Sequence, residues 1–474
     1  MTKIFDFAIF GGGIVGSAIF NKLTRLGKKC VLIEIAEDVC TGVSKANSAL
    51  VHSGFDAKQG SLKAKLNVRG NFLMPQLCKR LKVDFKHCGA VVVGNSLEKI
   101  EQLYSRGIQN GVPSDQLEIL KNDSLHALVP NLKKEIMFGL HAKNAGIVNV
   151  FMLNVALAEE AVINGAECRF GFETSAISSN NNIFSITNGK ETIHARQVIN
   201  ASGTGYNDIA KLLGSEQKKL SFRRGQYYVL NKDARNFVPL TVFPLPTEKG
   251  KGILATPTTD GNILFGPTAE ALENYNTETT ASGFSDIEKN INTLFDNVPF
   301  NQVIRQFSGV RIGCGEDFVI EKSKQVSGVI NICGINSPGL SASPAIAEYV
   351  CQLLGLDNEK EIANLLERST YNSIATKSSR EIESLIQENA KYGNIICKCE
   401  MVSEQEILNA IHSPLKPHTL DGIKRRVRTM AGQCQGGFCT MKVAQIIARE
   451  LAVDVDDVIK ENKTSNLCFP KEIL

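Results

Sequence analysis

The feature that most constrains this fold lies in the first 34 residues. Residues 5–10 are almost entirely apolar, and residues 11–16 read GGGIVG, which has the spacing G-x-G-x-x-G. A helical pattern occupies residues 14–26, and a second apolar stretch, residues 30–33, leads directly to Glu34. Strand, glycine turn, helix and strand in this order predict a βαβ unit at the start of a buried parallel sheet.

The same unit predicts a dinucleotide site. Gly11, Gly13 and Gly16 let the backbone approach a pyrophosphate, which the free N–H groups and the dipole at a helix amino terminus favour. Glu34 lies 18 residues beyond Gly16, where a carboxylate can accept hydrogen bonds from a ribose diol. An acid at this position favours FAD or NAD over a cofactor with a 2′-phosphate.

Four cysteines near the carboxyl end form a second signature. Cys397 and Cys399 make a C-x-C pair, and after a gap of 34 residues Cys434 and Cys439 make a C-x4-C pair. Four thiolates in two close pairs can bind a [2Fe–2S] cluster or one tetrahedral metal ion. Structural zinc sites more often have two to four residues between paired cysteines, and the glycines at 436–437 suit N–H groups close to cluster sulfurs. We therefore interpret the site as a cluster, with zinc as the alternative.

Charge and cysteine usage exclude some functions. The net charge of +4 is too small to indicate nucleic-acid binding. The basic run at residues 424–428 is interpreted as a solvated helix face, with docking of an acidic redox partner as the alternative. The 13 cysteines have no disulfide-framework spacing, which favours a reducing compartment.

The sequence carries no signal that favours export or membrane insertion. The amino terminus runs straight into a strand without a signal peptide, and no apolar stretch approaches the roughly 20 residues that a membrane helix requires. We therefore expect a cytoplasmic protein without a transmembrane segment, which could attach to a membrane through a partner.

Several motifs in the rest of the chain carry a family resemblance. They occupy residues 47–54, 243–253, 266–269, 308–311 and 337–340. Over about residues 5 to 370 the chain resembles the glycine-oxidase/D-amino-acid-oxidase-like superfamily of FAD enzymes. The likeness is greatest to its glycerol-3-phosphate dehydrogenase/oxidase branch, with L-2-hydroxyglutarate dehydrogenases next. From residue 392 the chain resembles a bacterioferritin-associated-ferredoxin-like [2Fe–2S] module.

The resemblance implies an α/β plus α+β architecture, in which a Rossmann-like FAD-binding domain carries an inserted mixed-sheet substrate domain. A small helical [2Fe–2S] domain follows. The expected boundaries are an oxidoreductase part at 1–385, a linker at 386–391 and the [2Fe–2S] domain at 392–474. Within the oxidoreductase part, the FAD domain is expected at about 1–80, 145–215 and 305–370, and the substrate domain at about 81–144 and 216–304. Independently, turn residues separate four β-rich runs, at 226–230, 241–246, 252–257 and 262–266.

The chemistry of such an enzyme requires a base, a hydride acceptor and charges that hold an anionic substrate. His52 is the candidate base because imidazole accepts a proton near neutral pH, and the resemblance implies a position beside the flavin ring. The alternative is a histidine that only shapes the pocket. The resemblance also implies that Arg311 and Lys251 bind the acidic group of the substrate. An arginine suits phosphate and carboxylate equally, so the substrate class stays open.

An apolar helix is predicted at residues 345–354, and its amino terminus would offer a second site for the flavin. The resemblance implies the remaining cofactor contacts. The expected residues are Ser44, Lys45, Asn47, Ser48, Gly203, Gly334, Gly339 and Leu340. One departure from the family pattern is Gln226, where relatives often carry an acid. Because of this departure, a 2-hydroxy acid remains an alternative to a phosphorylated substrate.

By this resemblance the chain would oxidise sn-glycerol 3-phosphate, a phosphorylated polyol, to dihydroxyacetone phosphate. Its cofactors would be FAD and a [2Fe–2S] cluster, and electrons would leave singly to a redox partner protein or a quinone-linked subunit, which allows a hetero-oligomer. The alternatives are an L-2-hydroxyglutarate dehydrogenase and a zinc-stabilised, flavin-carrying scaffold.

Overall fold

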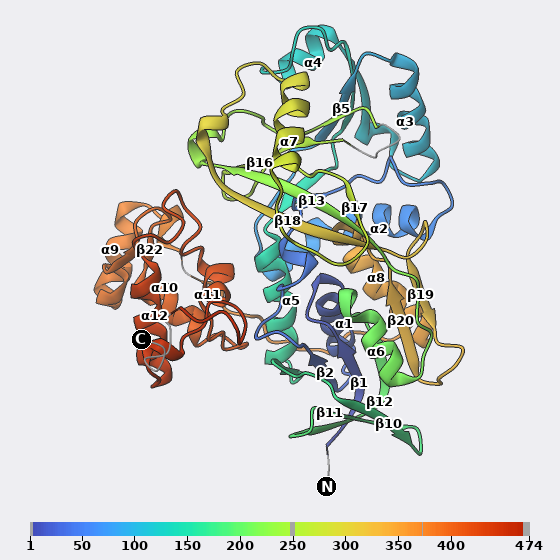
Figure 1. Cartoon of the computed structure of the whole chain (residues 1–474), viewed down its shortest axis with the longest axis vertical. Helices are drawn as coiled ribbons and strands as arrows, with labels where there is room; N and C mark the ends of the chain where they lie inside the picture. The colour runs from blue at the N-terminus through green and yellow to red at the C-terminus, as the bar shows by residue number, and fades with distance from the viewer. Residues whose placement is uncertain (1–2, 247–251, 372, 468–474) are drawn as a thin grey trace.

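A computed structural model describes residues 3–246, 252–371 and 373–467. Figure 1 shows three parts: a sheet near the amino terminus, a second sheet at the opposite end, and a helical carboxyl-terminal module to one side. None of the helices in these residues is long and apolar enough to cross a bilayer.

The first sheet has a parallel centre with antiparallel strands added to it. The described residues give it eight strands: β1 (Ile4–Phe10), β2 (Cys30–Ile33), β9 (Glu167–Arg169), β10 (Ala176–Asn180), β11 (Ile183–Thr187), β12 (Thr192–Asn200), β19 (Val319–Lys322) and β20 (Val329–Cys333). β1 lies between β2 and β12 and is parallel to both. Its residues from Phe7 to Phe10 are all apolar because both faces of the strand are covered there: Phe7 and Ile9 join one core, and Ala8 and Phe10 join another.

A layer of helices covers one face of this sheet. Its members pack against one another: α1 (Ile14–Arg25), α2 (Leu62–Leu81), α5 (Val150–Ile163) and α8 (Gly339–Leu354). α6 (Tyr206–Leu213) instead contacts β10 and β12. Polar caps begin two of these helices, since Ser61 accepts from the Ala64 N–H and Asn149 accepts from the Met152 N–H.

α8 begins six residues before the predicted start at residue 345. Pro344 lies inside the helix and has no N–H for the carbonyl of Leu340. The hydroxyl of Ser343 donates to that carbonyl at 2.9 Å and replaces the missing bond. Local side-chain chemistry therefore carries the helix through a residue that normally marks a boundary.

The second sheet is mixed. The part of the chain with described placement gives it nine strands: β5 (Ala90–Gly94), β6 (Leu117–Lys121), β7 (Phe138–Ala142), β13 (Ser221–Leu230), β14 (Thr241–Pro244), β15 (Leu254–Pro257), β16 (Ile263–Gly266), β17 (Glu270–Leu272) and β18 (Val303–Gly313). The four predicted β-rich runs correspond to β13 to β16, and the turn at 259–262 joins β15 to β16. β18 pairs along almost all of β13.

Smaller elements complete the two larger parts. Three helices accompany the second sheet: α3 (Leu97–Gln109), α4 (Asn122–Leu128) and α7 (Ala281–Leu294). A small antiparallel sheet contains β3 (Leu50–Val51), β4 (Phe85–Lys86) and β8 (Gly146–Val148). The 3-10 helices are η1 (Val43–Lys45), η2 (Ser114–Gln116), η3 (Gly203–Gly205), η4 (Lys232–Ala234), η5 (Phe300–Gln302), η6 (Ile374–Thr376), η7 (Ala390–Tyr392) and η8 (Val455–Asp457).

The carboxyl-terminal module has its own hydrophobic core, which includes Ile407, Ile423, Val443 and Ile447. Its elements are α9 (Ser379–Glu388), α10 (Glu404–Ile411), α11 (Leu420–Val427), α12 (Thr440–Leu451), β21 (Ile395–Cys397) and β22 (Val402–Ser403). Capping boxes begin α9 and α10, where a serine and the glutamate three residues later bond to each other's backbone N–H groups. The residues expected to form a linker at 386–391 include the end of α9 and the start of η7.

The interpretation of the basic run 424–428 as a solvated helix face is wrong. Arg425 and Arg426 are buried, and both bind Asp38, which follows β2 of the first sheet. Arg428 bonds to Asp260 in the turn between β15 and β16. The run holds the module against the rest of the protein, with α11 packed on α5.

Candidate active site

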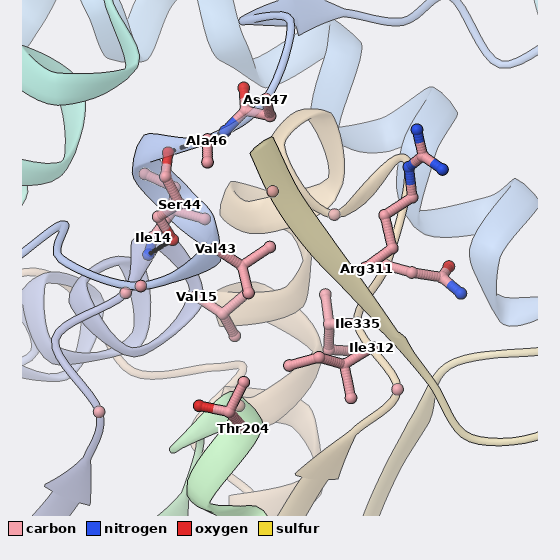
Figure 2. Close-up of a pocket in the computed structure, with 18 of the residues that line it drawn as sticks. Ile14, Val15, Val43, Ser44, Ala46, Asn47, Thr204, Arg311, Ile312 and Ile335 are labelled. Carbon is pink, nitrogen blue, oxygen red and sulfur yellow. Dashed lines mark hydrogen bonds between the residues drawn. The ribbon is translucent and has the colours of Figure 1, made fainter. Parts of the chain in front are cut away.

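A cavity of about 1390 Å³ lies between the first two sheets. Its wall is formed by the β1–α1 turn, the segment around η1, the start of α8, and strands β13 and β18. This volume exceeds the roughly 300–1,000 Å³ of most small-molecule pockets and suits a dinucleotide together with a substrate. In Figure 2, Ile14, Ser44 and Ala46 lie on one side of the cavity and Arg311 lies on the other.

The glycine loop brings the amino terminus of α1 to this cavity. Gly11 has a φ of +102°, and a Cβ there would lie 2.5 Å from the carbonyl oxygen of Ala201. A Cβ on Gly16 would lie 1.9 Å from the oxygen of Gly11, so Gly16 lets the helix pack against the loop. Gly11 and Gly13 line the cavity, whereas Gly16 is buried behind them.

Glu34 lines the cavity at the end of β2. Its carboxylate accepts hydrogen bonds from the Gly12 N–H at 2.5 Å and the Ala36 N–H at 2.9 Å. Burial raises the pKa of Glu34, and these two N–H groups oppose the rise. The carboxylate therefore stabilises the glycine loop and also presents its edge to the cavity.

The segment around η1 forms the wall next to the glycine loop. Ser44 accepts a hydrogen bond from the Ile14 N–H at 2.9 Å, and Asn47 bridges the Ser44 carbonyl and the Ala49 N–H. Ser44, Asn47 and Ser48 line the cavity. Lys45 forms an ion pair with Glu461 of the carboxyl-terminal module at 2.6 Å.

The second helix terminus and its flanking residues also reach the cavity. Gly334, Gly339 and Leu340 line it at the start of α8, and Gly203 lines it after β12. Ser341 is buried, where its hydroxyl accepts from the His52 N–H at 2.7 Å. α8 therefore fixes the backbone at His52 as well as contributing to the wall.

His52 lines the cavity and is buried against Phe55 and Phe243. The Gly54 N–H donates to Nδ1 at 3.2 Å, so the proton of the neutral ring lies on Nε2. Nε2 is 3.4 Å from Oδ1 of Asp56. Sequence reasoning missed Asp56, although an acid four residues after the candidate base could have suggested it.

Two arginines face the cavity from neighbouring strands. Arg223 of β13 is paired directly with Arg311 of β18, so their side chains project from the same face of the sheet, and both line the cavity. Like charges in this arrangement repel unless an anion lies between them. Sequence reasoning missed Arg223. Lys251, the other predicted substrate ligand, lies outside the described residues.

The neighbouring residues of β13 have a different role. Arg224 binds Glu270 at 2.8 Å, and Gln226 exchanges hydrogen bonds with Thr280 at the start of α7. Both side chains are buried in the contacts between β13, β17 and α7. The amide at Gln226 therefore serves packing around α7.

β18 connects all three parts of the protein. Arg305 near its start donates to Gln435 of the carboxyl-terminal module at 3.0 Å. A Cβ on Gly309 would lie 2.1 Å from the oxygen of Ala46, so the strand passes tightly against the η1 wall. Arg311 then reaches the cavity.

The four signature cysteines meet as two pairs. Cys397 and Cys439 share a hydrogen bond, as do Cys399 and Cys434. The bond from Cys439 and the N–H groups of Glu400 and Met430 lower the pKa of Cys397 to about 6, against the effect of burial. Within the described ranges, no three His, Cys, Asp or Glu side chains converge to hold one metal ion. Two thiol pairs with N–H groups at the sulfurs fit a two-iron cluster better than one tetrahedral zinc.

This cysteine site is open on one side. Cys397 and Cys439 are buried, but Cys399 is exposed. Phe438, between the two cysteines of the second pair, is 84% exposed, and Met401 and Met441 are also exposed. Of the large apolar residues that the structure describes as exposed, three therefore lie within two residues of a signature cysteine.

The fold and the two cofactor sites define a class, the flavoprotein oxidoreductases that carry an iron–sulfur module. The chain belongs to the family of FAD dependent oxidoreductases, whose model matches residues 6–353. Residues 395–449 match the BFD-like [2Fe-2S] binding domain. FAD and a [2Fe–2S] cluster are therefore its cofactors, and the predicted resemblance is confirmed.

Individual relatives agree with this assignment. A glycerol 3-phosphate dehydrogenase of Caloramator mitchellensis is 38% identical over 475 residues, 98% of each chain. An L-2-hydroxyglutarate dehydrogenase of Arabidopsis thaliana is 25% identical over 413 residues, covering 73% of this chain and 82% of its own. The L-alpha-glycerophosphate oxidase of Mycoplasma pneumoniae, solved with FAD bound, has a TM-score of 0.72 and 26% identity, over 77% of this chain and 98% of that one.

Proposed function

We propose that this protein oxidises sn-glycerol 3-phosphate to dihydroxyacetone phosphate and delivers the electrons one at a time to another redox component. The observation that carries the proposal is the arginine pair at the cavity. Arg223 and Arg311 face it from opposite positions on adjacent strands, and a dianionic phosphate would relieve their repulsion. Similarity to a glycerol 3-phosphate dehydrogenase along 98% of both chains supports the same substrate.

The cavity residues have distinct roles in this proposal. Arg311 and Arg223 bind the phosphate, with Lys251 as a further predicted ligand. His52 accepts the proton of the reacting hydroxyl. Because the Gly54 N–H occupies Nδ1, the ring must leave that contact to take a second proton, and the Asp56 carboxylate then stabilises the imidazolium.

We assign the cofactors to the residues around the two sites. Gly11, Gly13, Glu34, Ser44, Asn47, Ser48, Gly203, Gly334, Gly339 and Leu340 would contact FAD. Cys397, Cys399, Cys434 and Cys439 would hold the [2Fe–2S] cluster. When bound, FAD supplies a two-electron acceptor and the cluster supplies a one-electron carrier. The donor set agrees, because helix amino termini suit a pyrophosphate and paired thiols suit iron.

The open side of the cysteine site is the proposed electron exit. Cys399 is exposed there beside Phe438, and lysines 398 and 442 are exposed close by in the sequence. Apolar contact surrounded by positive charge suits an acidic redox protein or the acidic face of a quinone-linked subunit.

An L-2-hydroxyglutarate dehydrogenase is the second candidate, because arginine binds a carboxylate as well as a phosphate and such an enzyme is among the relatives. Anaerobic bleaching of the flavin absorbance separates the two. We expect sn-glycerol 3-phosphate to reduce the flavin, and glycerol and L-2-hydroxyglutarate to leave it oxidised at equal concentration. Reduction by L-2-hydroxyglutarate alone would refute the proposal.

A further inference from the structure

The cavity wall at residues 34–48 has little secondary structure of its own. Between the end of β2 at Ile33 and the start of β3 at Leu50, only η1 is regular. Ten residues of this wall nevertheless line the cavity: Glu34, Ile35, Ala36, Thr41, Gly42, Val43, Ser44, Ala46, Asn47 and Ser48. Contacts from outside the segment must therefore hold it in shape.

The first of these contacts is made at Asp38, which is 1% exposed. Its carboxylate accepts four hydrogen bonds from the carboxyl-terminal module, two from Arg425 at 3.0 and 3.2 Å and two from Arg426 at 2.7 and 3.0 Å. Burial would raise the pKa of Asp38, but Arg426 and Arg425 bring it below its ordinary value. This end of the wall is thus fixed to α11.

The second contact is made at the other end of the wall. Lys45 in η1 binds Glu461 of the module at 2.6 Å, and Glu461 also accepts from Arg425 at 3.0 Å. Asp38, Arg425, Glu461 and Lys45 therefore form one chain of alternating charges that spans the wall.

Other parts of the module support the same wall. Glu461 and Asn462 line the cavity themselves, and His418 lies 3.3 Å from Glu37. Leu415 packs into the hydrophobic core between the first sheet and its layer of helices. The interface between the module and the wall is therefore both polar and apolar, and residues of the module reach the cavity directly.

From these contacts we infer that the [2Fe–2S] module is a structural part of the FAD site, because it holds residues 34–48 in the conformation that binds the cofactor. Asp38 and Arg425 are positioning residues, since neither lines the cavity. The inference concerns FAD and does not depend on which substrate the enzyme oxidises. Coupling between two sites is reciprocal, so FAD must in turn stabilise the docked module.

The test measures FAD binding by the full-length protein. Asp38→Asn keeps the side-chain shape and removes the charge from the wall, while Arg425→Met removes the link from the module. We expect each to weaken FAD binding by about tenfold or more, within the usual range of coupling between sites. Quenching of FAD fluorescence on titration of the deflavinated protein gives the dissociation constant. If Asp38→Asn does not fold, Arg425→Met decides, because Arg426 still neutralises Asp38 in that variant.

A matched control and a second measurement exclude a general loss of stability. Arg449→Met breaks ion pairs with Glu404 and Glu450 inside the module, neither of which is among the wall contacts, and should leave FAD binding unchanged. Hydrogen exchange on the wild type should show that FAD slows exchange in α11, and exchange in residues 35–47 should be faster in Arg425→Met. Unchanged FAD affinity in Arg425→Met, or an equal loss in Arg449→Met, overturns the inference.

Discussion

Replacing Arg311 by methionine tests the proposed anion site most directly. Methionine keeps much of the side-chain volume and removes the guanidinium. We expect weaker binding of sn-glycerol 3-phosphate with little change in stability. The second expectation follows because relief of the repulsion between Arg311 and Arg223 offsets the loss of the 3.3 Å hydrogen bond that Arg311 donates to the Thr268 carbonyl.

The size of the effect follows from the contacts that the substrate would lose. A hydrogen bond to a charged group contributes about 1.5–3 kcal/mol. At about 1.4 kcal/mol per factor of ten, this predicts roughly 10- to 150-fold weaker binding. Arg223 remains in place and still attracts the phosphate, so the lower part of that range is expected. Arg311→Lys keeps the charge without the planar fork and should give a smaller loss.

The assay is anaerobic flavin reduction at increasing substrate concentration, read as the concentration that gives half the maximal rate. Arg305→Met is the matched control, since Arg305 lies on the same strand about 20 Å from Arg311 at 3.3 Å per residue and contacts the module. A half-saturating concentration in Arg311→Met within twofold of the wild type would show that the arginine pair does not bind the phosphate.

Three further predictions concern other groups. His52→Ala should slow flavin reduction in stopped flow by about 100-fold or more, and an unchanged rate would leave His52 a pocket residue only. Cys434→Ala should spare flavin reduction by substrate and abolish transfer to a one-electron acceptor, whereas retained transfer would remove the cluster from the path. The pKa of Asp38 is lowered from 3.8, so its stabilising effect is present above that pH and is lost as the pH falls toward the folded-state value. The melting temperature should therefore fall more below pH 4 in the wild type than in Asp38→Asn, and parallel curves would contradict this.

Local sequence patterns predicted much of the fold. The βαβ unit and the strands β14 to β16 follow from apolar periodicity and turn residues close together in sequence. Family resemblance predicted Ser44, Asn47 and Gly339 as cofactor contacts, and these residues do line the cavity. The spacing of the motifs also predicted that the four cysteines lie close to one another.

Other features depended on contacts between distant segments. Arg223 faces the cavity only because β13 pairs with β18 in one particular register, and a sequence pattern does not give that register. Likewise, Arg425 and Arg426 have the composition of an exposed basic helix, but both are buried against Asp38, almost 390 residues earlier, and Arg425 also binds Glu461. Gln226 departs from the family pattern, but its side chain serves α7.

Strand β18 fixes the distance between the carboxyl-terminal module and the cavity. Arg305, Gly309 and Arg311 are separated by even numbers of residues and therefore share one face of the strand. Inserting a single residue between Arg305 and Gly309 would turn either the module contact or the cavity-lining residues to the opposite side. The length of this one strand thus sets the spacing between the module contact at Arg305 and the cavity at Arg311.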